Sequence, residues 1–80
     1  MINPKFKPNM KTLQSILKVM MQNGTRNKSE LAVDTNLNYS RLAKHIIWLE
    51  SQEFVKSIIV ESQIHIEMTE KGRLFAKTIL

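Results

Sequence analysis

The 80-residue sequence contains no cysteine, only two glycines and two prolines, and no long apolar run. Without cysteine, disulfides and thiolate metal sites are excluded, and two histidines are too few for a zinc site built from histidine. The longest uninterrupted apolar run, Ile46 to Leu49, is far shorter than the roughly 20 residues that cross a bilayer. We therefore expect no metal, no cofactor, no membrane partner and a cytoplasmic location.

Motifs that mark common catalytic sites are also missing. There is no glycine-rich phosphate loop, no nucleophile in a glycine-flanked turn, and no pair of carboxylates suggested by spacing. Gly24 and Gly72 each fit a helix boundary or a packing role instead. The sequence therefore predicts a protein that is not an enzyme and has no small-molecule substrate.

Positive charge is concentrated in the first half of the chain. Residues 1–44 carry eight Lys and Arg side chains against two acidic ones, whereas residues 45–80 carry four against five. Such polarity is an electrostatic footprint for a polyanion, but a merely solubilising lysine-rich surface is an equal alternative on charge alone. A chain this short builds one modest core, so we expect a flexible arm over residues 1–8 and one domain over residues 9–80.

Two helices are expected in the first half of the chain. Asn9 can cap the first, and Gly24 can end it. Asn27 and Glu30 have the spacing of a capping box for a second helix of about two turns, which turn-forming residues 35–38 end. The apolar face of the first helix recurs at a spacing of three and four residues, at Leu13, Ile16, Leu17, Met20 and Met21.

A third helix is expected from about Asn38 to Gln52, and its two faces differ. No carboxylate falls between Tyr39 and Ile47. A surface helix usually mixes both charge signs, whereas a helix that faces phosphates should not. The inward stripe comprises Leu42, His45, Ile46 and Leu49, and the opposite face carries Ser40, Lys44, Ile47 and Ser51.

After Glu53 the pattern changes to segments rich in β-branched residues, which predict a hairpin over about residues 54–68. Its tip contains Glu61, Ser62 and Gln63, and without a glycine there the loop has either two or three residues. Thr69 can cap a last helix that begins at Glu70. We expect the inward residues of this last helix to be Leu74, Phe75 and Thr78.

Three helices, a hairpin and a fourth helix make an α+β winged helix-turn-helix, which presents the third helix to the major groove and uses the hairpin as a wing. We expect sequence-specific or semi-specific binding of double-stranded DNA, and therefore a nucleoid-associated transcriptional regulator. Residues near the start of the third helix reach base edges in this geometry. The predicted DNA contacts are Arg26, Lys28, Asn38, Tyr39, Ser40, Arg41, Lys44, Ile47, Ser62 and Gln63.

Over residues 25–75 the chain resembles archaeal winged helix-turn-helix DNA-binding proteins of the regulator and chromatin-associated type, and more loosely MarR-type regulators. The resemblance implies that the third helix enters the major groove. Relatives of this type usually have a glycine at the end of this helix, where this chain has Glu53. Because glutamate resists a left-handed conformation, we expect the chain to leave the helix differently. The motifs that carry the resemblance are Ser29 and Leu31, Tyr39-Ser40-Arg41-Leu42, Leu49, Phe54-Val55 and Met68-Thr69-Glu70-Lys71-Gly72.

Several residues have structural and functional interpretations. We expect His45 to pack in the core rather than act as a base or ligand, and the ring of Trp48 to pack under the wing. Ile47 can touch a thymine methyl group or a partner chain, and His65 on the wing is either exposed or near phosphate. The main alternative to DNA binding is a winged helix that serves as a protein-protein interaction module.

Apolar residues near both termini also predict a homodimer through the N- and C-terminal helices. Ile2, Phe6, Ile79 and Leu80 are left over once one small core is filled, and such surfaces usually form an interface. The alternative is that these termini fray in solvent.

Overall fold

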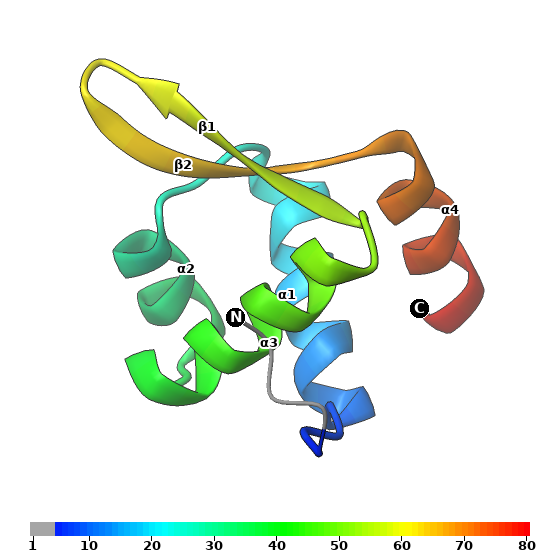
Figure 1. Cartoon of the computed structure of the whole chain (residues 1–80). Helices are drawn as coiled ribbons and strands as arrows, with labels where there is room; N and C mark the ends of the chain where they lie inside the picture. Colours follow the sequence, from blue (N-terminus) through cyan, green and yellow to red (C-terminus); the bar gives the residue numbers. More distant parts are fainter. Residues whose placement is uncertain (1–4) are drawn as a thin grey trace.

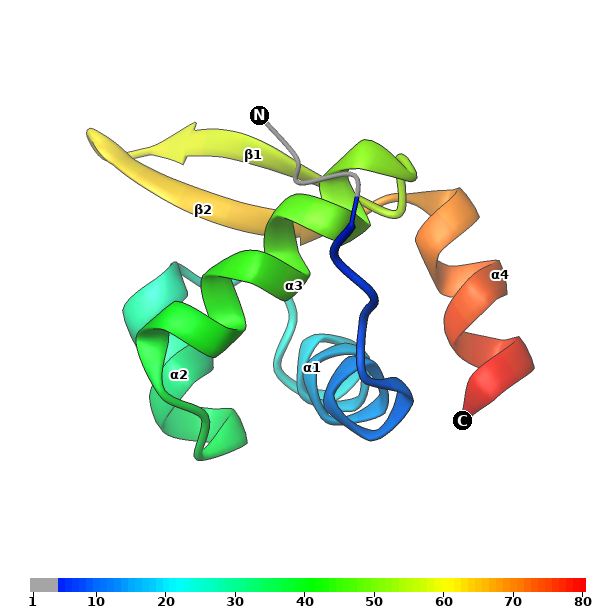
Figure 2. The ribbon, with the colours of Figure 1, turned by 60° about the horizontal axis from the view of Figure 1, so that its bottom comes forward.

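The computed structural model describes residues 5–80, and it confirms the predicted order of elements (Figure 1). Three helices precede a two-stranded antiparallel hairpin, and a fourth helix follows it. The hairpin projects away from the helices, and Figure 2 shows it running above α3 and toward the side of α2. The elements are α1 (Met10–Asn23), α2 (Lys28–Thr35), α3 (Tyr39–Ser51), β1 (Val55–Val60), β2 (Gln63–Met68) and α4 (Glu70–Ile79).

Each helix begins where a short polar side chain can accept a hydrogen bond from the first turn. Asn27 and Glu30 form the predicted capping box, in which each side chain accepts from the other's backbone N–H. Three further caps are confirmed: Asn9 accepts from Thr12 N at 3.0 Å, Asn38 from Arg41 N at 2.7 Å, and Thr69 from Gly72 N at 3.0 Å.

The core lies between α1, α2, α3 and the base of the hairpin. All four residues of the inward stripe predicted for α3 are buried, and so is the face predicted for α1 except Met21, which is exposed. Burial of this apolar surface is the main stabilising contribution to so small a fold. The largest fully buried side chains are Leu13, Ile16, Leu17, Leu31, Leu42, Ile46, Leu49, Val55 and Ile66.

The hairpin has a two-residue turn, which resolves the open choice of loop length. Val60 pairs with Gln63, so Glu61 and Ser62 alone form the turn, with φ of 51° and 67°. Positive φ at both positions is the type I′ arrangement that matches strand twist and usually takes Asn-Gly. The expectation about Glu53 was wrong, because this residue adopts the left-handed conformation itself, with φ of 64°.

The inward face of α4 differs from the prediction. Phe75 is half-buried against the core as expected, but Leu74 and Thr78 are exposed. The buried residues of α4 are the small ones, Gly72 and Ala76. At Gly72 the helix approaches the backbone of Phe54, at the start of the hairpin, closely. Hydrophobicity alone therefore predicted the wrong part of this helix surface.

Candidate nucleic-acid interface

The α2–α3 connection orients the outer face of α3. Asn36 ends α2 in the left-handed conformation, with φ of 58°, and Leu37 N donates to Ala32 O at 3.1 Å. Asn38 then caps α3, so the helix begins at Tyr39, three residues after the left-handed Asn36. The residues predicted to contact DNA on this helix are all exposed: Tyr39, Ser40, Arg41, Lys44 and Ile47.

A groove of about 480 Å³ lies where α2, α3 and the hairpin tip meet. It brings together four of the predicted site residues, Lys28, Tyr39, Ser62 and Gln63. No carboxylate lines it, so its hydrogen-bond donors and the Lys28 ammonium are unopposed by negative charge inside the groove. Sequence reasoning missed its other lining residues, Asn27, Ser29 and Ile64.

Arg26 lies apart from this groove. Its guanidinium contacts Glu30 at 3.1 Å and Asp34 at 3.8 Å, and its backbone forms a bridge to Ile66 of β2. Two carboxylates thus compensate its charge, and it lines a different depression together with Val33. The signal was present in the sequence, because Arg26 and Glu30 have the i, i+4 spacing of a helical ion pair.

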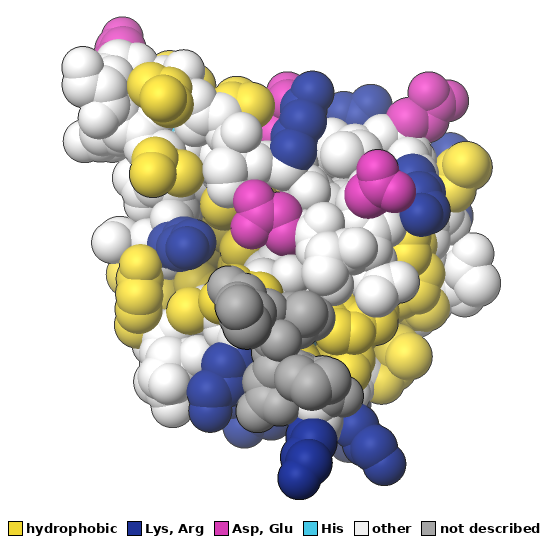
Figure 3. Space-filling model, viewed as in Figure 1, with side chains coloured by type: hydrophobic (Ala, Val, Ile, Leu, Met, Phe, Trp, Pro, Cys, Tyr) yellow, Lys and Arg dark blue, Asp and Glu magenta, His cyan; other side chains and the backbone are white. Residues whose placement is uncertain are grey.

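The distal hairpin is apolar rather than cationic. Residues 57–67 include no Lys or Arg, and Glu61 lies in the turn. Ile59 and Ile64 pair directly across the strands and are 78% and 60% exposed. Figure 3 shows hydrophobic side chains over this projecting part of the molecule. The positive charge of the interface therefore comes from α2 and α3, and the hairpin adds shape and polar groups at its tip.

His45 is a core residue, as expected, and its side chain is 4% exposed. Its Nε2 accepts the backbone N–H of Asn9 at 3.0 Å, and its Nδ1 lies 2.8 Å from the carbonyl oxygen of Arg41. These partners suit the neutral ring with its proton on Nδ1, because that nitrogen then donates while Nε2 accepts. The rings of His45 and Phe6 form a T-shaped contact with 5.1 Å between centroids, so Phe6 and Asn9 are held against α3.

Trp48 packs in an aromatic cluster at the start of the hairpin. Its ring lies 6.2 Å from Phe54 and 6.3 Å from Phe75, and those two rings stack on each other at 4.2 Å. The cluster joins α3, the residue before β1 and α4, and so helps to fix the direction in which the hairpin leaves the domain. We expected this ring to pack under the wing, and in the structure it packs at the base of the wing, against Phe54 and Phe75.

Residues 5–80 contain no cluster of His, Cys, Asp and Glu arranged to hold a metal ion. Within the same residues no helix has the length and apolar character required to span a bilayer.

A model of the winged helix-turn-helix family matches residues 9–79. A search of curated proteins found no significant sequence match. Among solved structures, a MarR family protein from Bacillus stearothermophilus has a TM-score of 0.78 at 19% identity, over 96% of this chain and 52% of that one. BpsR from Bordetella bronchiseptica has a TM-score of 0.80 at 12% identity, over 86% and 51%. A protein from Archaeoglobus fulgidus has a TM-score of 0.69 at 21% identity, over 94% and 84%.

The chain spans about half the length of the first two of these relatives. At these identities the likeness concerns the fold, and it agrees with the order of helices and hairpin described above. Because the family model covers nearly the whole described domain, the chain belongs to the winged helix-turn-helix family.

Proposed function

We propose that this protein binds double-stranded DNA through α3 and acts as a transcriptional regulator. The observation that carries the proposal is the exposed face of α3, where Arg41 and Lys44 project and no carboxylate occurs before Glu50. A helix of this kind fits a major groove about 12 Å wide, and an acid-free face avoids repulsion by phosphates.

Separate roles follow for the residues of α3. Arg41 can donate two hydrogen bonds to guanine, and Ile47 can contact a thymine methyl group. Lys44, Tyr39 and Ser40 suit phosphates beside the groove. The Asn38 side-chain oxygen is engaged in capping the helix, so its amide NH₂ is the group left to donate to DNA.

The groove beside α3 suits the sugar-phosphate backbone. Lys28 supplies a cation at the start of α2, and Ser62 and Gln63 supply polar groups from the hairpin tip. Phosphate contacts of this type set the register of a protein on the duplex. Arg26, which two carboxylates engage, stays a predicted contact without support from its surroundings.

The relatives support this proposal at the level of fold. In BpsR, 6-hydroxynicotinic acid regulates DNA binding. The second candidate function is a protein-protein interaction module, which is favoured by the exposed pair Ile59 and Ile64 in the distal part of the wing, where residues 57–67 include no Lys or Arg.

Selection of binding sites from a pool of random duplexes, followed by gel shifts, distinguishes the two functions. DNA binding predicts an enriched sequence, and Arg41→Ala should cost about 1–3 kcal/mol with relaxed preference at one base pair. Uniform weakening on all sequences would make Arg41 a phosphate contact only. The absence of any shift with the intact protein would favour the interaction module.

The homodimer expected through the terminal helices stays a prediction. Phe6 packs on His45 and Ile79 packs on the core, so both are less available than the sequence indicated, and Ile2 lies outside the described residues. A two-fold dimer would demand a palindromic site with half-sites about 34 Å apart or a multiple of that spacing. Light scattering would then report twice the 9.3 kDa chain mass.

A further inference from the structure

The hairpin has one unpaired strand edge, which we call the β1 edge and which is the outer side of residues Ser57–Val60. β1 pairs with β2 alone, and within residues 5–80 no backbone hydrogen bond joins this stretch to another element. The opposite edge of the hairpin differs, because Ile66 of β2 forms a bridge to Arg26 on the side of α2. Figures 1 and 2 both show β2 lying between β1 and α2. The β1 edge therefore faces away from the helix-turn-helix.

The alternation of the ladder decides which backbone groups point outward. Val60 and Gln63 flank the two-residue turn and so form a hydrogen-bonded pair. Every second residue of β1 bonds to β2 in the same way, and the residues between them direct their N–H and C=O groups away from β2. Along the β1 edge these residues are Ser57 and Ile59. Their N–H and C=O groups are available to an added strand.

The β1 edge lacks the features that usually prevent such pairing. Proteins protect an edge with charged residues, proline or a bulge. Residues 57–60 are Ser-Ile-Ile-Val, without charge, proline or glycine, and the register runs to the turn without a bulge. Apolar side chains are accessible on both faces of the strand, because Ile59 is 78% exposed and Val60 is 38% exposed. Both the backbone and the side chains of this edge therefore suit the addition of a strand.

Carboxylates lie at both ends of the β1 edge. Ser57 Oγ donates to Glu50 Oε2 at 2.9 Å, which places this carboxylate of α3 beside the start of the edge. Glu61 follows Val60 in the turn, at the other end. Neither carboxylate has an ion-pair partner within residues 5–80. Ser57 and Glu61 are four residues apart, about 13 Å along a strand, so two cations with that spacing on an added strand would each meet a carboxylate.

We propose that the β1 edge binds an extended segment of a partner protein as a third strand of the wing, with apolar β-branched residues between two cations. In this mode of recognition the main-chain hydrogen bonds give affinity, and the side chains on the two faces give specificity. The proposal is independent of DNA binding, because the groove beside α3 is lined by the turn and by β2 but by no residue of β1.

Two other occupants fit the β1 edge less well. Duplex DNA would find no cation along it, because residues 57–67 include no Lys or Arg. A second copy of this chain, with β1 paired to β1 antiparallel across a two-fold axis, would bring Glu50 of each copy toward Glu61 of the other. Carboxylates would then repel one another at both ends of the contact.

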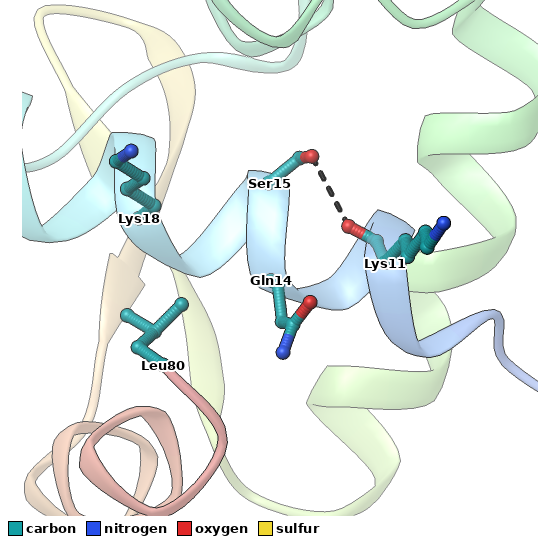
Figure 4. A pocket seen from close by; sticks show the side chains of 5 residues that line it. All are labelled: Lys11, Gln14, Ser15, Lys18 and Leu80. Carbon is teal, nitrogen blue, oxygen red and sulfur yellow. Dashed lines mark hydrogen bonds between the residues drawn. The ribbon is translucent and has the colours of Figure 1, made fainter.

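The homodimer predicted from the terminal helices uses another surface. Figure 4 shows the side chain of Leu80, at the end of α4, beside Gln14 and Lys18 of α1. This surface and the β1 edge have no residue in common. A dimer through the terminal helices and a strand added to the wing therefore do not compete for the same residues.

Fluorescence anisotropy tests strand addition with a labelled peptide of valine and threonine residues that carries two arginines four residues apart. The probe has N-methyl groups on alternate amides, which block one of its edges and prevent its self-association. One control peptide is N-methylated on the remaining amides too, so that neither edge can pair although every side chain is the same. A second control has glutamate in place of both arginines. The full chain should bind the probe at least about tenfold more tightly than either control.

Variants assign the binding to the β1 edge. Ile59→Pro removes an outward donor at a position where an edge strand tolerates proline, and it should weaken probe binding by about tenfold or more. Ile59→Val keeps the donor and should change the affinity by less than about twofold. Glu61→Lys should weaken binding by about threefold or more, whereas the matched change Glu70→Lys at the start of α4 should have no effect.

Circular dichroism checks that each variant folds, and Glu61→Lys keeps the test decisive if Ile59→Pro does not. In the wild type, a saturating concentration of the probe should slow hydrogen exchange at the Ser57 and Ile59 amides.

Equal affinity for the fully N-methylated peptide, or wild-type affinity in the folded variants at Ile59 and Glu61, overturns the proposal. Unchanged hydrogen exchange at both amides overturns it too. A dimer of the intact chain that Ile59→Pro dissociates would mean that a second copy occupies the edge, and would also overturn it. None of these measurements contains DNA, so their outcome is separate from that of DNA binding through α3.

Discussion

Gly72 of α4 lies directly against the backbone of Phe54, so that a Cβ atom on Gly72 would overlap the carbonyl oxygen of Phe54. The same carbonyl accepts the backbone N–H of Thr69 at 3.0 Å, which holds the start of α4 to the start of the hairpin. The direction of the hairpin relative to the helices thus depends on a position where only hydrogen fits. Because the hairpin tip lines the groove beside α3, this contact also affects the candidate interface.

Gly72→Ala should therefore destabilise the protein, even though alanine favours a helix over glycine by about 1 kcal/mol. Overlap with a backbone oxygen requires the chain to shift, and overpacking of this kind costs about 1–3 kcal/mol. Urea unfolding followed by Trp48 fluorescence measures the change, since that ring packs on Phe54. Thr78→Ala, at an exposed position of the same helix, is the control and should change stability by less than about 0.5 kcal/mol. A Gly72→Ala variant as stable as the wild type would contradict the close contact.

Glu53→Gly should have the opposite effect. Glu53 has a φ of 64°, a region that costs a non-glycine residue about 1–2 kcal/mol. Glycine relieves this cost but gains freedom in the unfolded chain, so the expected net gain is about 0.5–1 kcal/mol. Glu53→Gln keeps the side-chain length without the distant contact to Lys71 and should be close to neutral. The result that contradicts the reasoning is a loss of stability in the glycine variant alone.

Features set by neighbouring residues were predictable from the sequence, whereas those set by distant contacts were not. The caps at Asn9, Asn27, Asn38 and Thr69 depend on three-residue spacings and were confirmed. The inward face of α4 was predicted wrongly because Gly72 packs against Phe54, which is distant in sequence.

The candidate site shows the same division. The exposed face of α3 was predictable from the helical period, because the buried apolar stripe fixes which residues lie on the opposite side of the helix. The engagement of Arg26 by Asp34, eight residues away, depends on how α2 sits beside the preceding loop, and the two-residue hairpin turn depends on strand register. Neither is encoded in a local pattern.

Arg26→Ala and Lys28→Ala should separate stability from DNA binding. Arg26 pairs with two carboxylates, so Arg26→Ala should cost about 0.5–1 kcal/mol of stability. Its effect on DNA affinity should be smaller than that of Lys28→Ala. Lys28 lines the groove, so Lys28→Ala should leave stability almost unchanged and lower the salt slope of binding by about 1. Thermal unfolding and anisotropy titrations with duplex DNA on both variants measure the two quantities. The reverse pattern would mean that Arg26 rather than Lys28 lies beside the phosphates.

Glu61→Lys tests whether the hairpin tip lies beside DNA. The turn that contains Glu61 adjoins Ser62 and Gln63, so a cation there should increase DNA affinity by about threefold or more at low salt. Glu70→Lys at the start of α4 makes the same change of charge away from the groove and should have little effect. Equal gains in both variants would indicate a non-specific effect of net charge, and no gain in either would place the tip away from the phosphates.

The most direct measurement for the central claim is the salt dependence of binding to duplex DNA, determined for the wild type and for Arg41→Ala/Lys44→Ala. With Lys28, Arg41 and Lys44 as the cations on phosphate, log K should fall against log salt concentration with a slope of about −3 per protomer. The double variant should bind more weakly, with a slope of about −1. A wild-type slope near zero, or a double variant with unchanged affinity and slope, would contradict DNA binding through α3.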